Sequence, residues 1–161
     1  MKVLALATAI ASAALAQTSP VAACGPAGVR FKVVRDKTQH PLPVPRNGSA
    51  LLYVIGSTGG TVPIGIDGSW VGAVADRTYF TLPITPGEHH LCARRSTIGL
   101  VMFVPVPDHN VALRSLDAKP GEIYYLSATT VPDGGFKFAV LHADEGRRLL
   151  EKAKFSTSSR K

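Results

Sequence analysis

The sequence predicts an all-β fold, an antiparallel β-sandwich with one short helix near the C-terminus. Short segments of alternating or continuous apolar residues recur along the chain, separated by turns that contain Gly and Pro. An Asp67-Gly68 pair separates two of these segments, and Asp-Gly is typical of a tight hairpin turn. The chain has 161 residues, of which 45% are hydrophobic. This length and composition suit a single domain with a packed core.

The first 16 residues have the pattern of a secretory signal peptide. Lys2 supplies a positive charge, Val3–Leu15 is uncharged and largely apolar, and Ala14-Leu15-Ala16 offers the small residues that a signal peptidase recognises. The apolar run is shorter than the roughly 20 residues of a membrane-spanning helix. We therefore expect an exported protein in the periplasm or cell envelope of a bacterium.

Cys24 allows two interpretations of the N-terminal region. Val21-Ala22-Ala23-Cys24 resembles a bacterial lipobox, and cleavage after Ala23 would leave Cys24 as a lipidated membrane anchor. However, Gln17–Pro20 separate this motif from the apolar run, which a lipobox usually follows directly. A disulfide between Cys24 and Cys92 is the prediction that we favour, because thiols of exported proteins meet oxidising conditions. Lipidation of Cys24 is the alternative.

The composition divides the chain into four parts. Residues 1–16 are the signal peptide, with residue 23 as the alternative end. Residues 17–49 form an N-terminal tether with a first strand and a Pro-rich loop, and residues 50–154 form the sandwich. Residues 155–161 are a polar, basic tail that we expect to fray.

Strands are predicted where apolar residues alternate or form a short run. Leu51–Ile55 is a run of β-forming residues, which predicts a buried strand. Thr61–Val74 predicts a hairpin that turns at Asp67-Gly68. Thr78–Ile84 and Phe136–Val140 alternate, and this pattern predicts two half-buried strands.

Two segments share a Pro-Gly-Glu sequence, Pro86-Gly87-Glu88 and Pro120-Gly121-Glu122. Each lies between two segments with strand character. Pro presets the first corner of a turn, and Gly accepts the left-handed corner that follows. We therefore expect each Pro-Gly turn to close an antiparallel hairpin.

Segments with turn and aromatic signatures follow one another between residues 50 and 154. They are Leu51–Ile55, Ile66–Gly72, Thr78–Phe80, Pro86–Leu91, Lys119–Leu126 and Asp144–Gly146. In this order they resemble the bacterial DUF2846 family of small exported or lipid-anchored domains, which are similar to PEGA-type sandwiches. The resemblance implies a fold like that of transthyretin or an immunoglobulin domain. It implies no activity and no catalytic residues, because the function of the family is unknown.

The histidines are the strongest candidates for an enzymatic site. His89 and His90 are adjacent on a predicted strand, so they point to opposite faces and cannot easily share a metal ion. His90 and Cys92 share a face, but none of the usual zinc spacings occurs in the sequence. We expect no catalytic residue, no metal and no cofactor. The alternative is an exported hydrolase or metal-dependent enzyme that uses His89, His90 or His109.

The C-terminal helix, predicted over Asp144–Lys154 with Asp144 as its cap, is the strongest candidate for a binding surface. Its basic residues are Arg147, Arg148, Lys152 and Lys154. Such a face suits an anionic membrane or polymer. The alternative is an ordinary solvated face, because the apolar stripe of this helix is too narrow for firm insertion.

Trp70 is a second candidate for surface binding, as an exposed platform for a glycan or peptide, but a lone Trp on a return strand more often belongs to the core, and this is the interpretation that we favour. The formal net charge of +7 favours anionic partners. In an exported protein these are an envelope protein, a glycan or an anionic lipid surface rather than nucleic acid. We therefore expect a non-catalytic envelope module with a binding or structural role. A carrier of a small apolar ligand is a third class.

Overall fold

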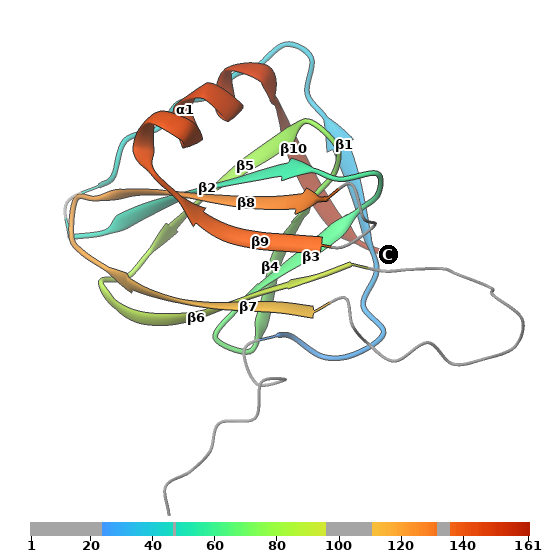
Figure 1. Ribbon diagram of the computed structural model, residues 1–161, viewed down its shortest axis with the longest axis horizontal. Coiled ribbons are helices and arrows are strands. Elements are labelled where there is room, and N and C mark those ends of the chain that lie inside the picture. The colour runs from blue at the N-terminus through green and yellow to red at the C-terminus, as the bar shows by residue number, and fades with distance from the viewer. Residues whose placement is uncertain (1–23, 47, 96–110, 132–135) are drawn as a thin grey trace, which may run out of the picture.

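The computed structural model describes residues 24–46, 48–95, 111–131 and 136–161. These residues form two facing β-sheets, with one helix on the outer side of the larger sheet (Figure 1). The all-β sandwich predicted from the sequence is confirmed. The proposed signal peptide and His109 lie outside the described residues.

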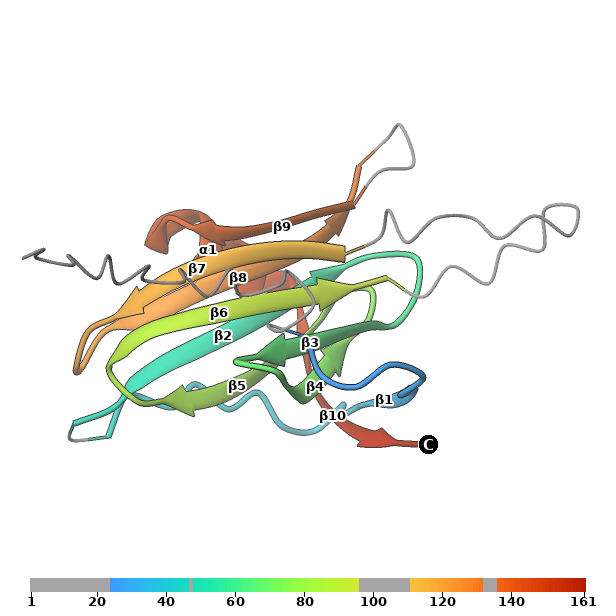
Figure 2. The same cartoon turned by 90° about the horizontal axis from the view of Figure 1, so that it is seen from below.

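The elements follow the chain in the order β1 (Phe31–Arg35), β2 (Ala50–Ser57), β3 (Val62–Ile66), β4 (Ser69–Val74), β5 (Thr78–Ile84), β6 (Gly87–Arg94), β7 (Val111–Ala118), β8 (Ile123–Thr130), β9 (Phe136–Leu141), α1 (Ala143–Lys152) and β10 (Lys154–Arg160). The six-stranded sheet has the order β1-β10-β5-β2-β8-β9, and the four-stranded sheet has the order β4-β3-β6-β7. Figure 2 shows the two layers from below.

The main hydrophobic core lies between the two sheets. Its largest buried side chains include Leu52, Ile64, Leu91, Leu126 and Phe138. They come from β2 and β3, from β6, and from β8 and β9, so both sheets contribute. Alternation along each strand sends these side chains inward and their neighbours outward.

The larger sheet is mixed, which corrects the expectation of purely antiparallel pairing. β2 pairs in parallel with β8, from Leu51 opposite Ile123 to Ser57 opposite Thr129. β10 also pairs in parallel with β5. Parallel neighbours need a connection that leaves the sheet. Here the chain after β2 forms β3 and β4 of the smaller sheet, returns to the larger sheet as β5, and forms β6 and β7 of the smaller sheet before it enters β8.

The tight turn predicted at Asp67-Gly68 is confirmed. Asp67 and Gly68 have φ angles of 49° and 81°, and a type I′ turn requires positive φ at both corners. β3 and β4 pair antiparallel across this turn, beginning with Ile66 opposite Ser69.

The two Pro-Gly turns do not close hairpins, contrary to the prediction. Pro86-Gly87 connects β5 of the larger sheet to β6 of the smaller sheet, and Pro120-Gly121 leads from β7 back to β8. Both glycines have positive φ, 127° and 77°, so the turn chemistry is as expected. Facing sheets lie about 10 Å apart, which is too far for the connected strands to form ladder hydrogen bonds. The two Pro-Gly segments therefore have the same structural role: each carries the chain from one sheet to the other.

The C-terminal residues form β10 rather than the fraying tail that we predicted. β10 pairs with β1 on one side and with β5 on the other. The Ser156 hydroxyl donates to the Tyr79 carbonyl oxygen at 3.2 Å, and the Ser158 hydroxyl accepts the Ala73 N–H at 3.0 Å. Because β1 and β10 both belong to the larger sheet, the predicted boundaries at residues 49 and 154 do not bound the domain.

The helix α1 lacks the cap predicted for it. The residue before α1 is His142, and no side chain caps the first turn. Asp144 lies inside that turn instead, where it pairs with Arg147 at 2.5 Å. Its carboxylate still faces the positive end of the helix. On the opposite side of α1, Gly146 and Leu150 are buried against the sheet.

A disulfide joins Cys24 to Cys92 of β6, as predicted, with Cα atoms 5.2 Å apart and a sequence separation of 68. It ties the N-terminal segment to the smaller sheet. The same segment covers Trp70, because Gly25 packs on the indole ring and the indole N–H donates to the Pro26 carbonyl oxygen at 2.8 Å. Trp70 is only 6% exposed. The core position that we favoured for Trp70 is therefore confirmed, and the alternative of an exposed platform is wrong.

Gly146 allows α1 to approach β8, and its replacement tests this packing. A Cβ atom at position 146 would overlap the Cβ atom and the ring of Tyr125. Although Ala favours a helix by about 1 kcal/mol over Gly, we expect Gly146→Ala to lower the free energy of unfolding by about 1–3 kcal/mol, because overpacking displaces the helix or the ring. Urea unfolding measures the change, with the exposed Glu145→Ala as control. A more stable Gly146→Ala protein would contradict this contact.

The disulfide occupies the sulfur atom that lipidation of Cys24 would modify. We therefore expect mature protein from its native cells to carry neither a free thiol nor a lipid at Cys24. Alkylation under denaturing conditions without reductant, followed by intact mass measurement, tests this. Alkylated cysteine or the added mass of a diacylglycerol would show the prediction to be wrong.

We also expect Cys92→Ala to lower the free energy of unfolding by about 2–4 kcal/mol, since the disulfide closes a long loop of the unfolded chain.

Candidate functional site

The histidines described by the structure do not form a metal site. Within the described ranges, no group of three or more His, Cys, Asp or Glu side chains is close enough to hold a metal ion. Cys92 belongs to the disulfide and so is not available as a ligand beside His90. His89 has hydrogen bonds to the protein at both ring nitrogens. Its environment is that of a structural residue.

The Asp67–His89 pair links the β3–β4 turn to β6. Nδ1 of His89 lies 2.6 Å from Oδ2 of Asp67, and Nε2 lies 2.8 Å from the carbonyl oxygen of Thr85. A carbonyl oxygen only accepts, so Nε2 carries a proton, and the carboxylate at Nδ1 favours the doubly protonated ring. Oδ1 of Asp67 accepts the His90 N–H at 2.8 Å. The pair therefore holds the hairpin turn against its neighbouring strand.

Opposing effects set the pKa values of this pair. Burial acts to lower the pKa of His89, but the hydrogen bonds to Asp67 and Thr85 and the Asp67 charge outweigh burial and raise the pKa. Burial acts to raise the pKa of Asp67, but the His90 N–H and the His89 ring outweigh burial and lower it. Both shifts favour the charged pair.

The outer face of the larger sheet carries a second apolar cluster, which is the base of the candidate site. Tyr53 of β2 lies between Tyr79 of β5 and Tyr125 of β8, with ring centroids 6.3 Å and 5.4 Å apart respectively. All three side chains are buried. Leu150 of α1 and Ala153, the residue after α1, pack into this cluster. The remaining cover comes from the Pro-rich loop between β1 and β2.

This loop, residues 36–46, is fixed to the sheet by tyrosine hydroxyls, and we call it the Pro strap. Tyr79 donates to the Pro41 carbonyl oxygen at 2.9 Å, and Tyr53 donates to that of Pro43 at 2.7 Å. Burial, with the charge of a neighbouring tyrosine, raises the pKa of Tyr53 and raises that of Tyr79 to about 12. The hydroxyls therefore remain donors at physiological pH.

The outer side of the Pro strap is aliphatic. Leu42 is 58% exposed and Val44 is 74% exposed, and Val34 of β1, shortly before the strap, is 49% exposed. Among the described residues, these are three of the four large hydrophobic side chains that are exposed; the fourth is Val140. Exposed apolar groups that gather in one place indicate an interaction surface more strongly than scattered ones.

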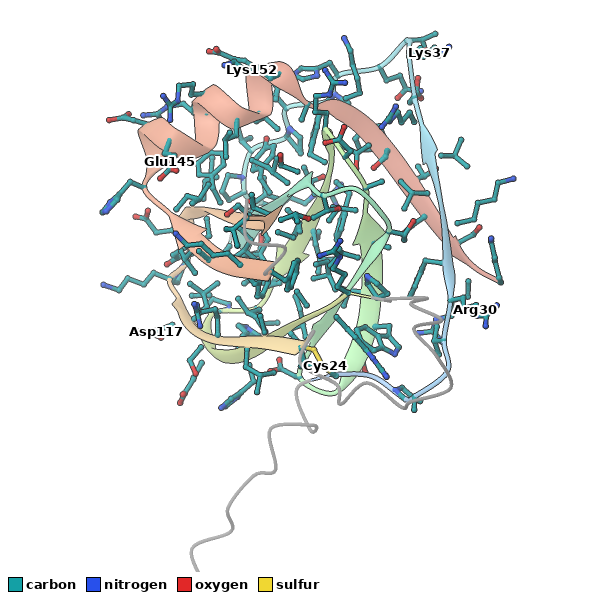
Figure 3. All side chains as sticks on the ribbon, turned by 45° about the vertical axis from the view of Figure 1, so that its right-hand side comes forward. Cys24, Arg30, Lys37, Asp117, Glu145 and Lys152 are labelled. Atoms are coloured by element: carbon teal, nitrogen blue, oxygen red, sulfur yellow. A yellow bond between two sulfur atoms is a disulfide. The ribbon has the colours of Figure 1, made fainter. Side chains whose placement is uncertain are left out.

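Cations flank these aliphatic side chains. Lys37 and Arg46 are exposed at the two ends of the Pro strap. The Asp36 N–H donates to the Phe155 carbonyl oxygen at 2.8 Å, which brings the start of the strap to the end of α1. Figure 3 shows Lys37 and Lys152 at the same end of the molecule, with Asp117 of β7 away from it. The strap face, as we define it, comprises Lys37, Leu42, Val44, Arg46 and Lys152. Lys154 begins β10 and, by alternation with Phe155 of the outer cluster, belongs to the other face of the sheet.

The helix α1 contributes less charge than we predicted. Arg147 and Arg148 are exposed, as expected for a surface role. However, Arg147 pairs with Asp144, and the exposed Glu145 and Glu151 offset further positive charge on the same helix. An exposed pair of this kind contributes little to stability. The positive charge near α1 is therefore concentrated at its C-terminal end and on the Pro strap.

No family model, curated protein or solved structure matches this chain. The resemblance to DUF2846 therefore stays a prediction. In the part of the chain that the structure describes, no helix has the length and hydropathy needed to cross a membrane. The case for a function rests on the geometry of the strap face.

The Pro strap was not predicted as a functional element, since its sequence is that of a loop outside the expected domain. Its signal is present in the sequence, because Pro41, Pro43 and Pro45 alternate with Leu42 and Val44. Proline favours an extended chain without internal hydrogen bonds. Such a chain can present one side to a sheet and the other to solvent.

The pH dependence of stability tests the Asp67–His89 pair. Because the pKa of His89 is raised by folding, its contribution is complete below the unfolded value of about 6.5 and is lost as pH rises through the folded pKa. The lowered pKa of Asp67 gives a contribution that is complete above about 3.9 and is lost in acid. We expect a loss of about 1 kcal/mol from pH ~6 to ~9.

His89→Gln should remove this alkaline loss, and the exposed His142→Gln should retain it. Urea midpoints across the pH range measure both variants. If the wild-type and His89→Gln profiles run parallel between pH ~6 and ~9, the ion pair does not stabilise the fold.

Proposed function

We propose that the mature chain is a non-catalytic module of the bacterial cell envelope that binds an anionic lipid surface through its strap face. The observation that carries this proposal is the exposure of Leu42 and Val44 between the cations Lys37 and Arg46. Aliphatic side chains enter the boundary between headgroups and acyl chains, while Lys and Arg attract anionic headgroups. The strap face offers both kinds of group.

The expected binding is weak and reversible. Each Lys or Arg close to an anionic bilayer contributes about 1 kcal/mol, and full burial of a Leu or Val side chain contributes about 1.5–3 kcal/mol. Partial insertion of two aliphatic side chains, with two or more cations, gives about 5 kcal/mol. This corresponds to a dissociation constant somewhat below 1 mM, about 0.2 mM. Salt must weaken the binding, because the cations are exposed and screened.

The Pro strap is suited to this task because it is held in place before binding. Two tyrosine hydroxyls fix its carbonyl groups at Pro41 and Pro43. Proline also restricts the backbone. A side chain presented from a fixed backbone loses less conformational entropy on binding. The strap can therefore contribute more of its contact energy to affinity than a flexible loop of the same composition.

Two observations support a non-catalytic protein in an oxidising compartment. The disulfide between Cys24 and Cys92 is consistent with export, and the residue pattern that predicts a signal peptide over residues 1–16 agrees with it. The enzyme alternative depends on His89, His90 or His109. Both ring nitrogens of His89 are engaged by Asp67 and Thr85. His89 therefore has no lone pair free for a metal ion or a substrate proton.

Co-sedimentation with vesicles tests the proposal. We expect the mature protein to bind phosphatidylglycerol-containing vesicles at about 50 mM salt, to bind far less at about 500 mM, and not to bind pure phosphatidylcholine. Leu42→Ser with Val44→Ser should reduce binding at least about fivefold. Lys37→Gln with Arg46→Gln should reduce it by a similar factor.

A matched control removes two charges elsewhere. Arg30, just before β1, and Arg114 of β7 are exposed, and Figure 3 shows Arg30 away from Lys37 and Lys152. Arg30→Gln with Arg114→Gln should leave vesicle binding unchanged. Equal losses for the two charge pairs would indicate a general charge effect and contradict a role for the strap face. Absence of binding to anionic vesicles, with binding to peptidoglycan or an anionic polymer instead, would rule out a lipid partner.

A further inference from the structure

A cavity of about 180 Å³ lies between the end of α1 and the outer face of the larger sheet. Ile55 and Ser57 of β2, with Ser127 and Thr129 of β8, form its floor. Ile55 is paired in register with Ser127, and Ser57 is paired with Thr129. These side chains point outward because Ser127 and Thr129 have the same parity along β8 as Tyr125 of the outer cluster. The floor is therefore built on two central strands.

The walls of the cavity come from α1, from the residue after it, and from the β4–β5 turn. They are Leu149, Lys152, Ala153 and Arg77. Arg77 has a φ angle of 49°, a left-handed conformation that costs a residue other than Gly about 1 kcal/mol or more. Its carbonyl oxygen accepts the Lys154 N–H at 2.9 Å. This hydrogen bond fixes the turn beside the end of the helix.

The lining has an apolar part and a part that donates hydrogen bonds. Ile55, Leu149 and Ala153 supply the apolar part. The Ser57 hydroxyl is a donor on the floor, and the exposed side chains of Arg77 and Lys152 are long enough to bring a guanidinium and an ammonium group to the mouth, while the lining itself is mostly apolar. No carboxylate is among the residues that line the cavity. Such a set of donors suits an anionic group.

Two nearby features act against an anion, and both are weak. Asp76 pairs with Arg77 at 3.4 Å, but the Arg77 side chain is 76% exposed, so most of its donors stay available. The last carbonyl groups of α1 carry partial negative charge. However, the Ala153 N–H donates to the Leu150 carbonyl oxygen at 3.1 Å, and Lys152 lies in that last turn.

The volume limits the ligand to a small molecule. An apolar cavity of about 150 Å³ holds benzene, whereas drug-sized ligands need about 300–1,000 Å³. We infer that this cavity binds an unbranched carboxylate of about four to six carbons. Its aliphatic tail lies over Ile55, Leu149 and Ala153, and its carboxylate lies between Arg77 and Lys152 at the mouth. This site shares Lys152 with the strap face but contains none of Lys37, Leu42, Val44 and Arg46, the residues whose substitution tests the lipid binding.

Titration with carboxylates of increasing length tests the inference. We expect butanoate, pentanoate and hexanoate to shift the amide NMR signals of Ser57, Ser127 and Thr129 and of the end of α1. Affinity should rise about fourfold per methylene until the tail fills the cavity, and then stop rising. Alcohols of equal length should bind at least about fivefold more weakly, because they lack the charge.

Substitutions separate the two parts of the site. Ser127→Leu fills the cavity from its floor and should abolish saturable binding. Arg77→Gln with Lys152→Gln should weaken carboxylate binding at least about fivefold at low salt and leave alcohol binding unchanged. Arg147→Gln with Arg148→Gln removes the same charge from exposed positions of α1 outside the cavity. It should leave both affinities unchanged.

Three results would overturn the inference. The first is the absence of localised shifts with any carboxylate, and the second is equal affinity for carboxylate and alcohol. The third is full carboxylate affinity in Ser127→Leu when its urea midpoint matches the wild type. If Ser127→Leu does not fold, Thr129→Leu takes its place in this test, because a leucine at position 129 narrows the cavity from the half-buried end of β8. Leu42 and Val44 do not line the cavity, so failure of vesicle binding leaves these results unaffected.

Discussion

The central strand β2 is buried on both faces from Ala50 to Gly56, and the remaining architecture follows from this constraint. Its inward side chains pack against the smaller sheet, as in any sandwich. Its outward side chains, Tyr53 and Ile55, belong to the cluster on the opposite face. Because a buried tyrosine removes about 150–250 Å² from water, this face needs a third layer. α1 covers the part over β8, and the Pro strap covers the part over β5. Segments that look like appendages in the sequence are therefore structural elements.

Both surfaces that we connect with function arise from this third layer. The tyrosine hydroxyls need acceptors, and the Pro strap has carbonyl groups without helix or sheet partners, so each satisfies the other. Leu42 and Val44 are left facing solvent between these fixed points. The cavity lies where the layer ends, after Lys152. There the outward residues of β2 and β8 change from large side chains to Ser57 and Thr129. Small side chains at this end leave space that α1 does not fill.

The sequence was most informative where one residue pair decides the geometry, as at Asp67-Gly68. The Pro-Gly turns show the limit of such reasoning, because a hairpin and a passage between sheets need the same backbone angles and differ only in distant partners. β10 escaped prediction because Ser156 and Ser158 are placed by hydrogen bonds to other strands, and hydrophobic periodicity does not detect these. The exposure of Leu42 and Val44 likewise depends on hydroxyl groups supplied by strands far along the chain. The charged residues of α1 were plain in the sequence, but the pairing of Arg147 with Asp144 was not predicted, because Asp144 was expected to cap the helix rather than to lie inside its first turn.

The chemistry of Cys24 decides which surface the strap face can meet. Figure 3 shows Cys24 at one end of the molecule and Lys37 and Lys152 at the other. With the disulfide formed, the N-terminal segment is held at the Cys24 end by Cys92 and by the bond from Trp70 to Pro26. A lipid attached at that end would place the strap face away from the anchoring membrane. Lipidation and the disulfide exclude each other because both use the Cys24 sulfur atom, and the disulfide form leaves the molecule free to present its opposite end to the lipid.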